Sequence, residues 1–258
     1  MNNNFYYNKN ILIIGASFGI GEALAQQLAQ AGANLFLTAR SKDKIVALAN
    51  KLNGQNYAYS CDITNQKQVK KLCQEIENKW SKIDLIIFSA GIYEPMSLNN
   101  YSAEIAANII AVNFTAILNF LDFFHKIAKK NALSHLAIIS SAASYFGMPN
   151  SLAYGASKAA LSSLTESLFY ELQQYKVKVQ LINPAFVKTR LTAKNNFTMP
   201  NIITVNQAAK IIIRNLNKRK FEISFPLAFM TFMQIGKILP FKLRAFFLKK
   251  MVQNKEKN

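Results

Sequence analysis

Two side chains of one predicted helix are spaced for proton transfer. Tyr154 and Lys158 are four residues apart, so they share a face of that helix. A free tyrosine has a pKa of about 10 and is a poor acid at neutral pH, but a neighbouring ammonium favours the phenolate and lowers this pKa. Ser141 follows a predicted strand, and its hydroxyl can hydrogen-bond a substrate oxygen. The three residues predict acid–base chemistry at an oxygen atom.

Three glycines form a turn that can hold phosphate. Gly15, Gly19 and Gly21 lie between the first predicted strand and the first predicted helix. Glycine permits a tight turn and a close backbone approach, and the N–H groups at a helix start attract a pyrophosphate. The spacing G-x-x-x-G-x-G differs from the commoner G-x-G-x-x-G. The turn predicts a dinucleotide site, and an ordinary glycine-rich turn is the alternative.

The end of the second predicted strand favours a phosphorylated dinucleotide. A site for NAD usually places Asp or Glu about 20 residues after the glycines, on the ribose hydroxyl. Here Arg40 and Ser41 occupy that place. A guanidinium can bind a 2′-phosphate through two parallel hydrogen bonds. The residues predict NADP(H), with NAD(H) as the alternative if Arg40 only begins a solvated helix.

These residues need a sheet that brings them together. Short apolar segments alternate with helical segments along the chain. Strands are predicted at 10–14, 34–38, 56–60, 83–88, 136–140, 177–182 and 222–225. Helices are predicted at 22–31, 42–52, 65–80, 103–130, 152–174 and 208–217. Apolar strands that are each followed by a helix indicate a doubly wound, three-layer α/β Rossmann fold with seven parallel strands and a ligand at their carboxyl ends.

The order of these motifs resembles the short-chain dehydrogenase/reductase (SDR) family, in its subtype of about this length. The resemblance runs from Ile11 to about Phe225. It rests on the glycine turn, Cys61-Asp62-Ile63-Thr64, Ser89-Ala90-Gly91, Asn113, Ser141, Tyr154-Gly155-Ala156-Ser157-Lys158 and Asn183-Pro184-Ala185-Phe186-Val187-Lys188-Thr189. It implies a hydride transfer between a nicotinamide and a carbonyl carbon, or the reverse oxidation of an alcohol.

The resemblance also implies a role for each matched residue. Tyr154 would donate the proton, Ser141 would hydrogen-bond the carbonyl oxygen, and Lys158 would lower the tyrosine pKa and hold the nicotinamide ribose. Asn113 would hold a water that links Lys158 to solvent. The implied catalytic residues are Asn113, Ser141, Tyr154 and Lys158. The implied cofactor-binding residues are Gly15, Ser17, Phe18, Gly19, Ile20, Gly21, Arg40, Ser41, Asp62, Ile63, Ser89, Ala90, Gly91, Asn113, Tyr154, Lys158, Pro184, Val187 and Thr189.

Four positions depart from the family pattern. Ile14 stands in the usual place of Thr, Ser89 in that of Asn, and Ala185 in that of Gly. Phe18 replaces a basic residue that is often present in NADP users, so Arg40 has to carry the preference for NADP(H). None of the four belongs to the implied catalytic set.

Composition excludes several other classes of protein. With 258 residues and 51% hydrophobic content, the chain can bury a substantial core, which excludes wholesale disorder. Cys61 and Cys73 cannot form a disulfide framework and favour a reducing compartment, and two histidines without a Cys-x-x-Cys pair predict no metal site. No segment is predicted to span a membrane or to act as a signal peptide. We expect a cytoplasmic protein.

The charge balance favours anionic partners. The 31 Lys and Arg against 13 Asp and Glu give a net charge of +18. These residues are spread along the chain without a nucleic-acid-binding motif, so no specific nucleic acid is expected. An acidic carrier protein would suit this charge, which keeps a 3-oxoacyl-carrier-protein reductase as an alternative. A non-catalytic dinucleotide sensor or scaffold is the alternative from another class. The resemblance further implies a homo-oligomer, a dimer or a tetramer.

The substrate region is predicted to be apolar. A mobile flap is expected at 190–204, within a domain of residues 1–225. Apolar residues of the flap and of the predicted pocket mouth are Leu191, Phe197, Met199, Tyr93, Phe146, Met148 and Phe186. They favour an apolar ketone, aldehyde or alcohol over a sugar, and a lipid-like molecule is one such substrate.

Residues 226–258 are predicted to form a helical extension that is not an independent domain. The extension is rich in Phe, Met, Leu and Ile, with Lys and Arg in its later part. Its apolar run is too short to span a bilayer. Three roles remain open: association of 226–250 with the inner face of a membrane, packing against another copy or partner, and a lid over the substrate pocket.

Overall fold

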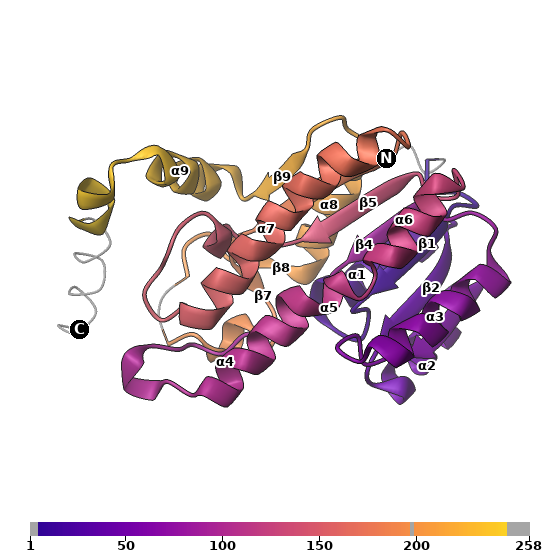
Figure 1. Cartoon of the computed structure of the whole chain (residues 1–258), viewed down its shortest axis with the longest axis horizontal. Coiled ribbons are helices and arrows are strands. Elements are labelled where there is room, and N and C mark those ends of the chain that lie inside the picture. The colour runs from indigo at the N-terminus through magenta and orange to yellow at the C-terminus, as the bar shows by residue number, and fades with distance from the viewer. Residues whose placement is uncertain (1–4, 197–198, 247–258) are drawn as a thin grey trace.

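A parallel sheet of seven strands forms the centre of the computed structural model, which describes residues 5–196 and 199–246 (Figure 1). In space the strands follow the order β3-β2-β1-β4-β5-β6-β9. Their bounds are Asn10–Ile14 (β1), Asn34–Ala39 (β2), Asn56–Ser60 (β3), Leu85–Phe88 (β4), His135–Ile139 (β5), Lys178–Pro184 (β6) and Glu222–Phe225 (β9). The predicted seven-stranded parallel sheet is confirmed.

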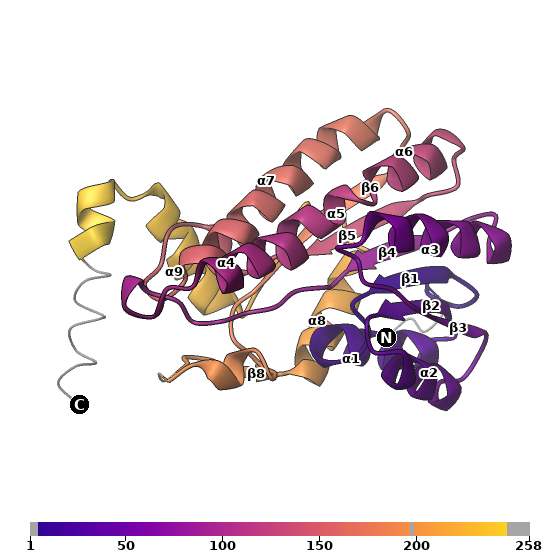
Figure 2. The same cartoon turned by 60° about the horizontal axis from the view of Figure 1, so that its bottom comes forward.

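Helices cover both faces of the sheet (Figure 2). One face carries α1 (Gly19–Gln30), α2 (Lys42–Lys51) and α8 (Val205–Leu216). The other carries α3 (Gln66–Lys79), α5 (Ala116–Leu118), α6 (Leu121–Lys129) and α7 (Leu152–Gln173). Successive residues of β1 divide between the two cores, with Ile11 and Ile13 in one and Leu12 and Ile14 in the other. This double burial explains why the strands are apolar throughout.

The strand order reverses beside β1, and this places the site. β1 pairs with β2 on one side and with β4 on the other. The turns that leave β1 and β4 therefore diverge and open a crevice at the carboxyl edge of the sheet. The backbone N–H groups of Gly15 and Ala16 both donate to the carbonyl oxygen of Thr38, which fixes the glycine turn to the end of β2.

The long helix predicted at 103–130 is interrupted. It begins as α4 (Ala103–Ile110), widens into a π-helical turn at Ala111–Thr115, and continues as α5 and α6. By length and composition alone, Ala103–Lys129 could cross a membrane. Phe120 and Phe124 of this segment are buried in the core against the sheet. About a third of its most apolar stretch is buried, so core packing accounts for part of its apolar character.

The helix after β9, α9 (Leu227–Ile238), projects from one end of the sheet in both views (Figures 1 and 2). Met230 and Met233 are its buried contacts, and they pack with Ala142, Tyr145 and Phe146. Between β6 and α9 the chain forms two short paired strands, β7 (Val187–Lys188) and β8 (Ile203–Thr204). They close the predicted flap, in which Phe197 lies outside the described residues.

Candidate active site

A cavity of about 350 Å³ opens at the carboxyl edge of the central strands. All of the predicted catalytic and cofactor-binding residues line this first cavity except Gly21 and Asn113. Gly21 lies under the glycine turn, where an added Cβ would come within 2.2 Å of the Gly15 carbonyl oxygen. Asn113 is fully buried behind the wall. Residues from six strand ends, far apart in the sequence, thus surround one space.

The glycine turn leaves backbone groups available to a ligand. Gly15 has a φ of +94°, and a Cβ there would lie 2.6 Å from the backbone nitrogen of Ala90. Gly19, with a φ of +65°, begins α1, and Phe18 at the N-cap position gives that helix no side-chain hydrogen bond. The first N–H groups of α1 therefore have no side-chain cap, as a pyrophosphate site requires.

Tyr154 and Lys158 occupy one face of α7, as predicted. Lys158 is 4% exposed, and its Nζ donates to the Ile139 carbonyl oxygen at 3.1 Å. The same Nζ lies 5.9 Å from the centre of the Tyr154 ring. Burial lowers the pKa of Lys158 to about 8. These contacts place a buried cation beside the tyrosine.

The pKa of Tyr154 differs from the sequence-based expectation. Burial raises this pKa above its ordinary value, and a hydrogen bond with Ser141 offsets part of that rise. We expected Lys158 to lower it. In this structure the loss of hydration is the largest influence on the Tyr154 pKa, and the charged form of Lys158 is disfavoured by its own burial.

Asn113 is bound to the loop that follows β4. Its Oδ1 accepts from the Ile92 N–H at 2.7 Å, and its Nδ2 donates to the Ile92 carbonyl oxygen at 3.0 Å. The Nδ2 also donates to Ser157 Oγ at 3.0 Å. A Cβ added to Gly91 would lie 3.4 Å from both Asn113 Oδ1 and Lys158 Nζ. The π-helical turn therefore aims the asparagine at the gap between Gly91 and Lys158.

A second tyrosine supports the first. The rings of Tyr93 and Tyr154 meet edge to face, with their centres 4.8 Å apart. The Tyr93 hydroxyl donates to Asn195 Oδ1 at 2.7 Å. Tyr93 thereby connects the ring of Tyr154 to the predicted flap.

One end of the first cavity is basic. Arg40 and Ser41 line it, together with Lys44 of α2. Sequence reasoning missed Lys44, because a lysine on a helix surface has no distinguishing local signal. Asp62, which also lines the cavity, caps its own turn by accepting hydrogen bonds from the Thr64 N–H at 3.0 Å and the Thr64 hydroxyl at 2.7 Å.

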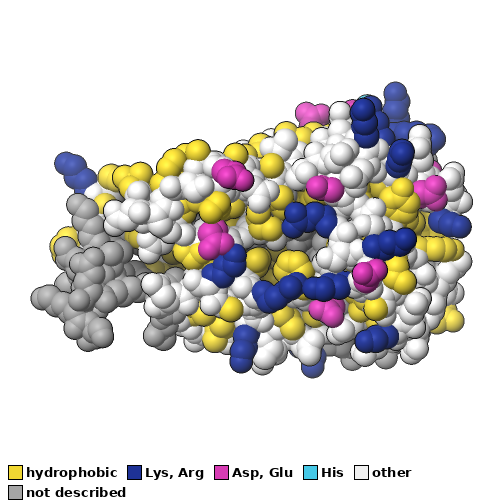
Figure 3. Space-filling model, turned by 90° about the horizontal axis from the view of Figure 1, so that it is seen from below, with side chains coloured by type: hydrophobic (Ala, Val, Ile, Leu, Met, Phe, Trp, Pro, Cys, Tyr) yellow, Lys and Arg dark blue, Asp and Glu magenta, His cyan; other side chains and the backbone are white. Residues whose placement is uncertain are grey.

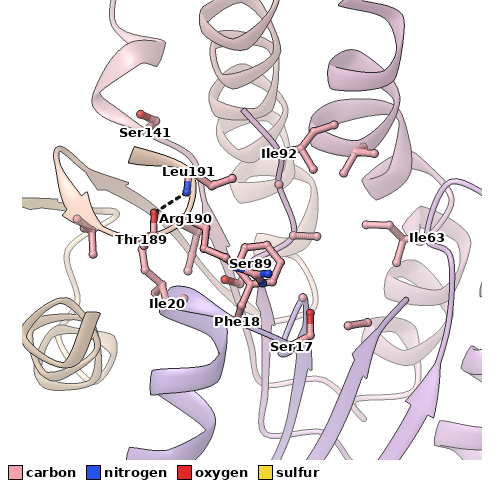
Figure 4. A pocket seen from close by; sticks show the side chains of 18 of the residues that line it. Ser17, Phe18, Ile20, Ile63, Ser89, Ile92, Ser141, Thr189, Arg190 and Leu191 are labelled. Carbon is pink, nitrogen blue, oxygen red and sulfur yellow. Dashed lines mark hydrogen bonds between the residues drawn. The ribbon is translucent and has the colours of Figure 1, made fainter. Parts of the chain in front are cut away.

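Arg190 is a further cavity residue that the sequence did not reveal. Its guanidinium carbon lies 4.1 Å from the centre of the Phe18 ring. Figure 4 shows the Arg190 side chain reaching from the loop of Thr189 and Leu191 towards Phe18. Phe18 stands where a basic residue was expected in an NADP user. The structure thus brings a cation to that place from the other wall of the cavity.

A second cavity, of about 120 Å³, adjoins the first. Ser141 and Tyr154 line both. Most other side chains around the second cavity are apolar, and they include Met148, Phe186, Leu191, Phe229 and Met233. Phe229 and Met233 belong to α9. Of the three roles open for the extension, α9 therefore takes part in enclosing this pocket.

Metal ligands do not gather in the described ranges, 5–196 and 199–246. No group of three or more His, Cys, Asp or Glu residues there could hold a metal ion. Cys61 and Cys73 are buried thiols, and burial raises their pKa values to about 11 and about 12. Neither is suited to act as a nucleophile at neutral pH.

Known proteins resemble this chain in sequence and in fold. An uncharacterized oxidoreductase of Myxococcus xanthus is 29% identical over 235 residues, which are 90% of this chain and 93% of that protein. A short chain dehydrogenase of Burkholderia cenocepacia, solved with NADP, has a TM-score of 0.81 at 22% identity, covering 94% of this chain and 98% of that one. A short chain dehydrogenase/reductase of Burkholderia phymatum, solved with NAD, has a TM-score of 0.80 at 23% identity, covering 90% and 93%.

The two solved structures show a shared fold. The family model described as short chain dehydrogenase matches residues 9–199 of this chain. That match covers most of the chain and includes the glycine turn, Asn113, Ser141, Tyr154 and Lys158. The chain therefore belongs to the short-chain dehydrogenase family.

Proposed function

We propose that this short-chain dehydrogenase is an NADP(H)-dependent oxidoreductase that interconverts an apolar ketone or aldehyde and the corresponding alcohol. One observation carries the proposal: Tyr154 and Ser141 line two adjoining cavities, of which one has the glycine turn and the other has apolar walls. A proton donor at this junction can reach an oxygen held in the second cavity while a dinucleotide occupies the first.

The residues of the first cavity fit a dinucleotide. The uncapped start of α1 and the close approach at Gly15 would hold the pyrophosphate, and Lys158 would hold the nicotinamide ribose. Asp62 would hold the adenine, and Val187 and Thr189 the carboxamide. When bound, the cofactor supplies or takes up the hydride.

The chain's own part in the reaction is proton transfer and orientation. In the reductive direction, the Tyr154 hydroxyl donates its proton to the carbonyl oxygen, and the Ser141 hydroxyl hydrogen-bonds the same oxygen. The buried Lys158 ammonium stabilises the tyrosinate that remains. Asn113 holds the Ile92 loop and Ser157 in place around this pair.

Four residues support a preference for NADP(H). Arg40, Ser41 and Lys44 line one end of the first cavity, and Arg190 lies on the Phe18 ring beside it. Guanidinium and ammonium groups bind a phosphate more strongly than a neutral hydroxyl. The added 2′-phosphate should therefore favour NADP(H) over NAD(H).

The substrate class follows from the second cavity. Apolar side chains make up most of its lining, and polar ones such as Asn150, Ser151 and Asn195 are the minority. We therefore infer an apolar, lipid-like carbonyl or alcohol. We also propose that residues 1–225 form the catalytic domain, with a flap at 190–204, and that residues 226–258 are an extension of it.

The protein is also proposed to form a homo-oligomer through α4 and α7. Ile105 of α4 and Phe169 and Tyr170 of α7 are exposed apolar side chains. Burial of these side chains in an interface between copies would remove their apolar surface from water, which favours association.

The test compares NADPH and NADH consumption over ketones and aldehydes of increasing chain length, free and as carrier-protein thioesters. We expect NADPH to be preferred and the rate to rise with chain length of the free substrates. A strict requirement for the thioester would favour a 3-oxoacyl-carrier-protein reductase instead.

Tyr154→Phe is the control for catalysis. It should abolish turnover and leave the dissociation constant of NADPH, measured by fluorescence titration, nearly unchanged. Tight NADPH binding by the parent protein without turnover of any substrate would contradict the proposed reaction and favour a dinucleotide sensor.

A further inference from the structure

The outward face of α9 is apolar, and no contact with residues 5–196 or 199–246 buries it. On the inward face, Met230 and Met233 are at most 2% exposed. On the outward face, Phe232, Ile235 and Ile238 are 56%, 54% and 85% exposed. Helical spacing places the two sets on different sides of the helix. Large apolar side chains so exposed mark a surface that meets another phase or molecule.

Two further exposed apolar side chains lie at the start of the helix and just after its end. Leu227, at the start of α9, is 76% exposed, and Phe241, in the turn-and-helix that follows, is 73% exposed. We name Leu227, Phe232, Ile235, Ile238 and Phe241 the outer face. We propose that the outer face and its neighbouring basic residues dock on an anionic lipid surface.

The charge of the segment around the outer face indicates which partner covers it. Lys242 is exposed and follows Phe241 of the outer face, and Lys237 of α9 is also exposed, with its Nζ 5.9 Å from the centre of the Tyr145 ring. The sequence from 226 to 255 contains Lys and Arg but no Asp or Glu. A two-fold interface between copies would set this basic segment against itself or against a surface that is also basic in a chain of net charge +18. Anionic lipid complements both the apolar side chains and the charge.

Length determines the mode of docking. α9 has 12 residues and is therefore about 18 Å long, shorter than the roughly 30 Å of a hydrocarbon core. Pro240 follows it and cannot extend the helix. A short helix with one apolar face and flanking lysines lies in the plane of the interface. The helix would thus rest on one leaflet.

Docking has a consequence for the substrate pocket. Phe229 and Met233, from the other side of the same helix, line the second cavity. A docked α9 therefore places the pocket beside the phase in which apolar carbonyl compounds concentrate. This consequence rests on the proposed function. Vesicle binding by the protein without cofactor or substrate does not rest on that function, so the docking proposal and the proposed function can fail separately.

The experiment measures co-sedimentation of the full chain with vesicles of phosphatidylcholine, with and without phosphatidylglycerol. Wild-type protein should bind the anionic vesicles, and binding should fall as salt is raised. The variant Phe232→Ser/Ile235→Ser/Ile238→Ser should lose about tenfold or more of this affinity. Lys237→Glu/Lys242→Glu should lose the response to phosphatidylglycerol.

A matched variant controls for general loss of exposed apolar side chains. Val46→Ser/Leu98→Ser/Tyr101→Ser changes three exposed residues away from α9 and should bind vesicles like the wild type. Thermal unfolding and NADPH affinity should be unchanged in every variant, since none of these residues lines the first cavity. Vesicle binding by the outer-face variant equal to that of the wild type, or no binding by the wild type, would overturn the proposal. So would dissociation of an oligomer by the outer-face variant in the absence of lipid, since a second copy would then cover the face.

Discussion

Burial shifts the pKa values of Tyr154 and Lys158 in opposite directions. Loss of hydration raises the pKa of the tyrosine and lowers that of the lysine, so both neutral forms are favoured in the structure. The proposed reaction needs the charged lysine to stabilise a tyrosinate. Burial of the charged lysine therefore lowers the free energy of unfolding, and replacing the lysine with an apolar residue should raise it.

Lys158→Met should abolish turnover and stabilise the fold. The folded-state pKa of about 8 lies below the ordinary 10.5, so burying the charge costs stability in full below about pH 8. This cost disappears as the pH rises from 8 to 10.5. At pH 7 the variant should gain up to about 3 kcal/mol in free energy of unfolding. Urea unfolding at several pH values measures the difference, which should shrink as the pH rises. A difference independent of pH would contradict a buried charged lysine.

Arg190 should contribute to cofactor affinity through its position on Phe18. Arg190→Gln should raise the dissociation constant of NADPH about 5- to 30-fold, because it removes a cation from the cavity wall. Lys188→Gln, two residues away and exposed, is the matched control and should change affinity little. Fluorescence titration with both cofactors locates the contact. A loss confined to NADPH indicates the 2′-phosphate, and an equal loss with NADH indicates the pyrophosphate.

Phe18→Leu tests whether stacking positions the guanidinium. It keeps an apolar side chain but removes the ring face, so it should weaken NADPH binding only when Arg190 is present. Additive losses in the double variant would show that the two residues act independently.

At the scale of elements, the sequence predicted the sheet well because each strand is an apolar segment bounded by turns. Helix starts were less predictable. α8 begins at Val205, before the predicted start at 208, because Thr204 and Gln207 form a capping box there. This signal is local and was available in the sequence. The π-helical turn was not, since it depends on the distant contact between Asn113 and Ile92.

The candidate site divides in the same way. Its motif residues sit at strand ends, so their convergence could be predicted from the strand order of a doubly wound sheet. The places of Arg190 and Met233 in the site could not be predicted. The first depends on the path of the flap, and the second depends on how α9 packs against the domain. Both depend on tertiary contacts between segments with no shared sequence signal.

Met233 should limit the size of the substrate. Met233→Ala enlarges the second cavity and should raise kcat/KM for long or branched ketones relative to short ones, whereas Met233→Trp should do the reverse. A change of one or two methylenes in an apolar pocket is worth about 1–3 kcal/mol, or roughly 10- to 200-fold. Ile235→Ala on the outward side of α9 is the control. Assays run without lipid should find its chain-length profile equal to that of the wild type.

At the scale of the whole molecule, the net charge predicted that the protein attracts anions, but it did not predict where on the surface they bind. Figure 3 shows Lys and Arg side chains in a broken line across one face, with Asp and Glu side chains between them. Charge of this kind attracts many polyanions weakly and in a salt-dependent way. Specific function depends instead on the few cations that face the cavity or border the outer face.

Oligomer formation is the prediction that belongs to this scale. Ile105→Lys combined with Phe169→Lys places charges on the exposed sides of α4 and α7. Light scattering should show a reduced mass, because burying two uncompensated ammonium groups per subunit opposes association. The outer-face variant should keep the wild-type mass. An unchanged mass in the lysine variant would exclude these helices as the interface.

The wide turn at Ala111–Thr115 has a consequence for the tolerance of this protein to deletions. A π-helical turn holds one residue more than an α-helical turn, so the helix before it is rotated by about 100° relative to an uninterrupted continuation. Deleting one residue there, such as Ala111, would restore a regular helix. Either α4 would then turn its packing face away from α7, or Asn113 would leave Ile92. The extra residue is thus required to keep both the packing of α4 on α7 and the contact of Asn113 with Ile92. Deletions at this point should be far less tolerated than in the exposed loop at 53–55.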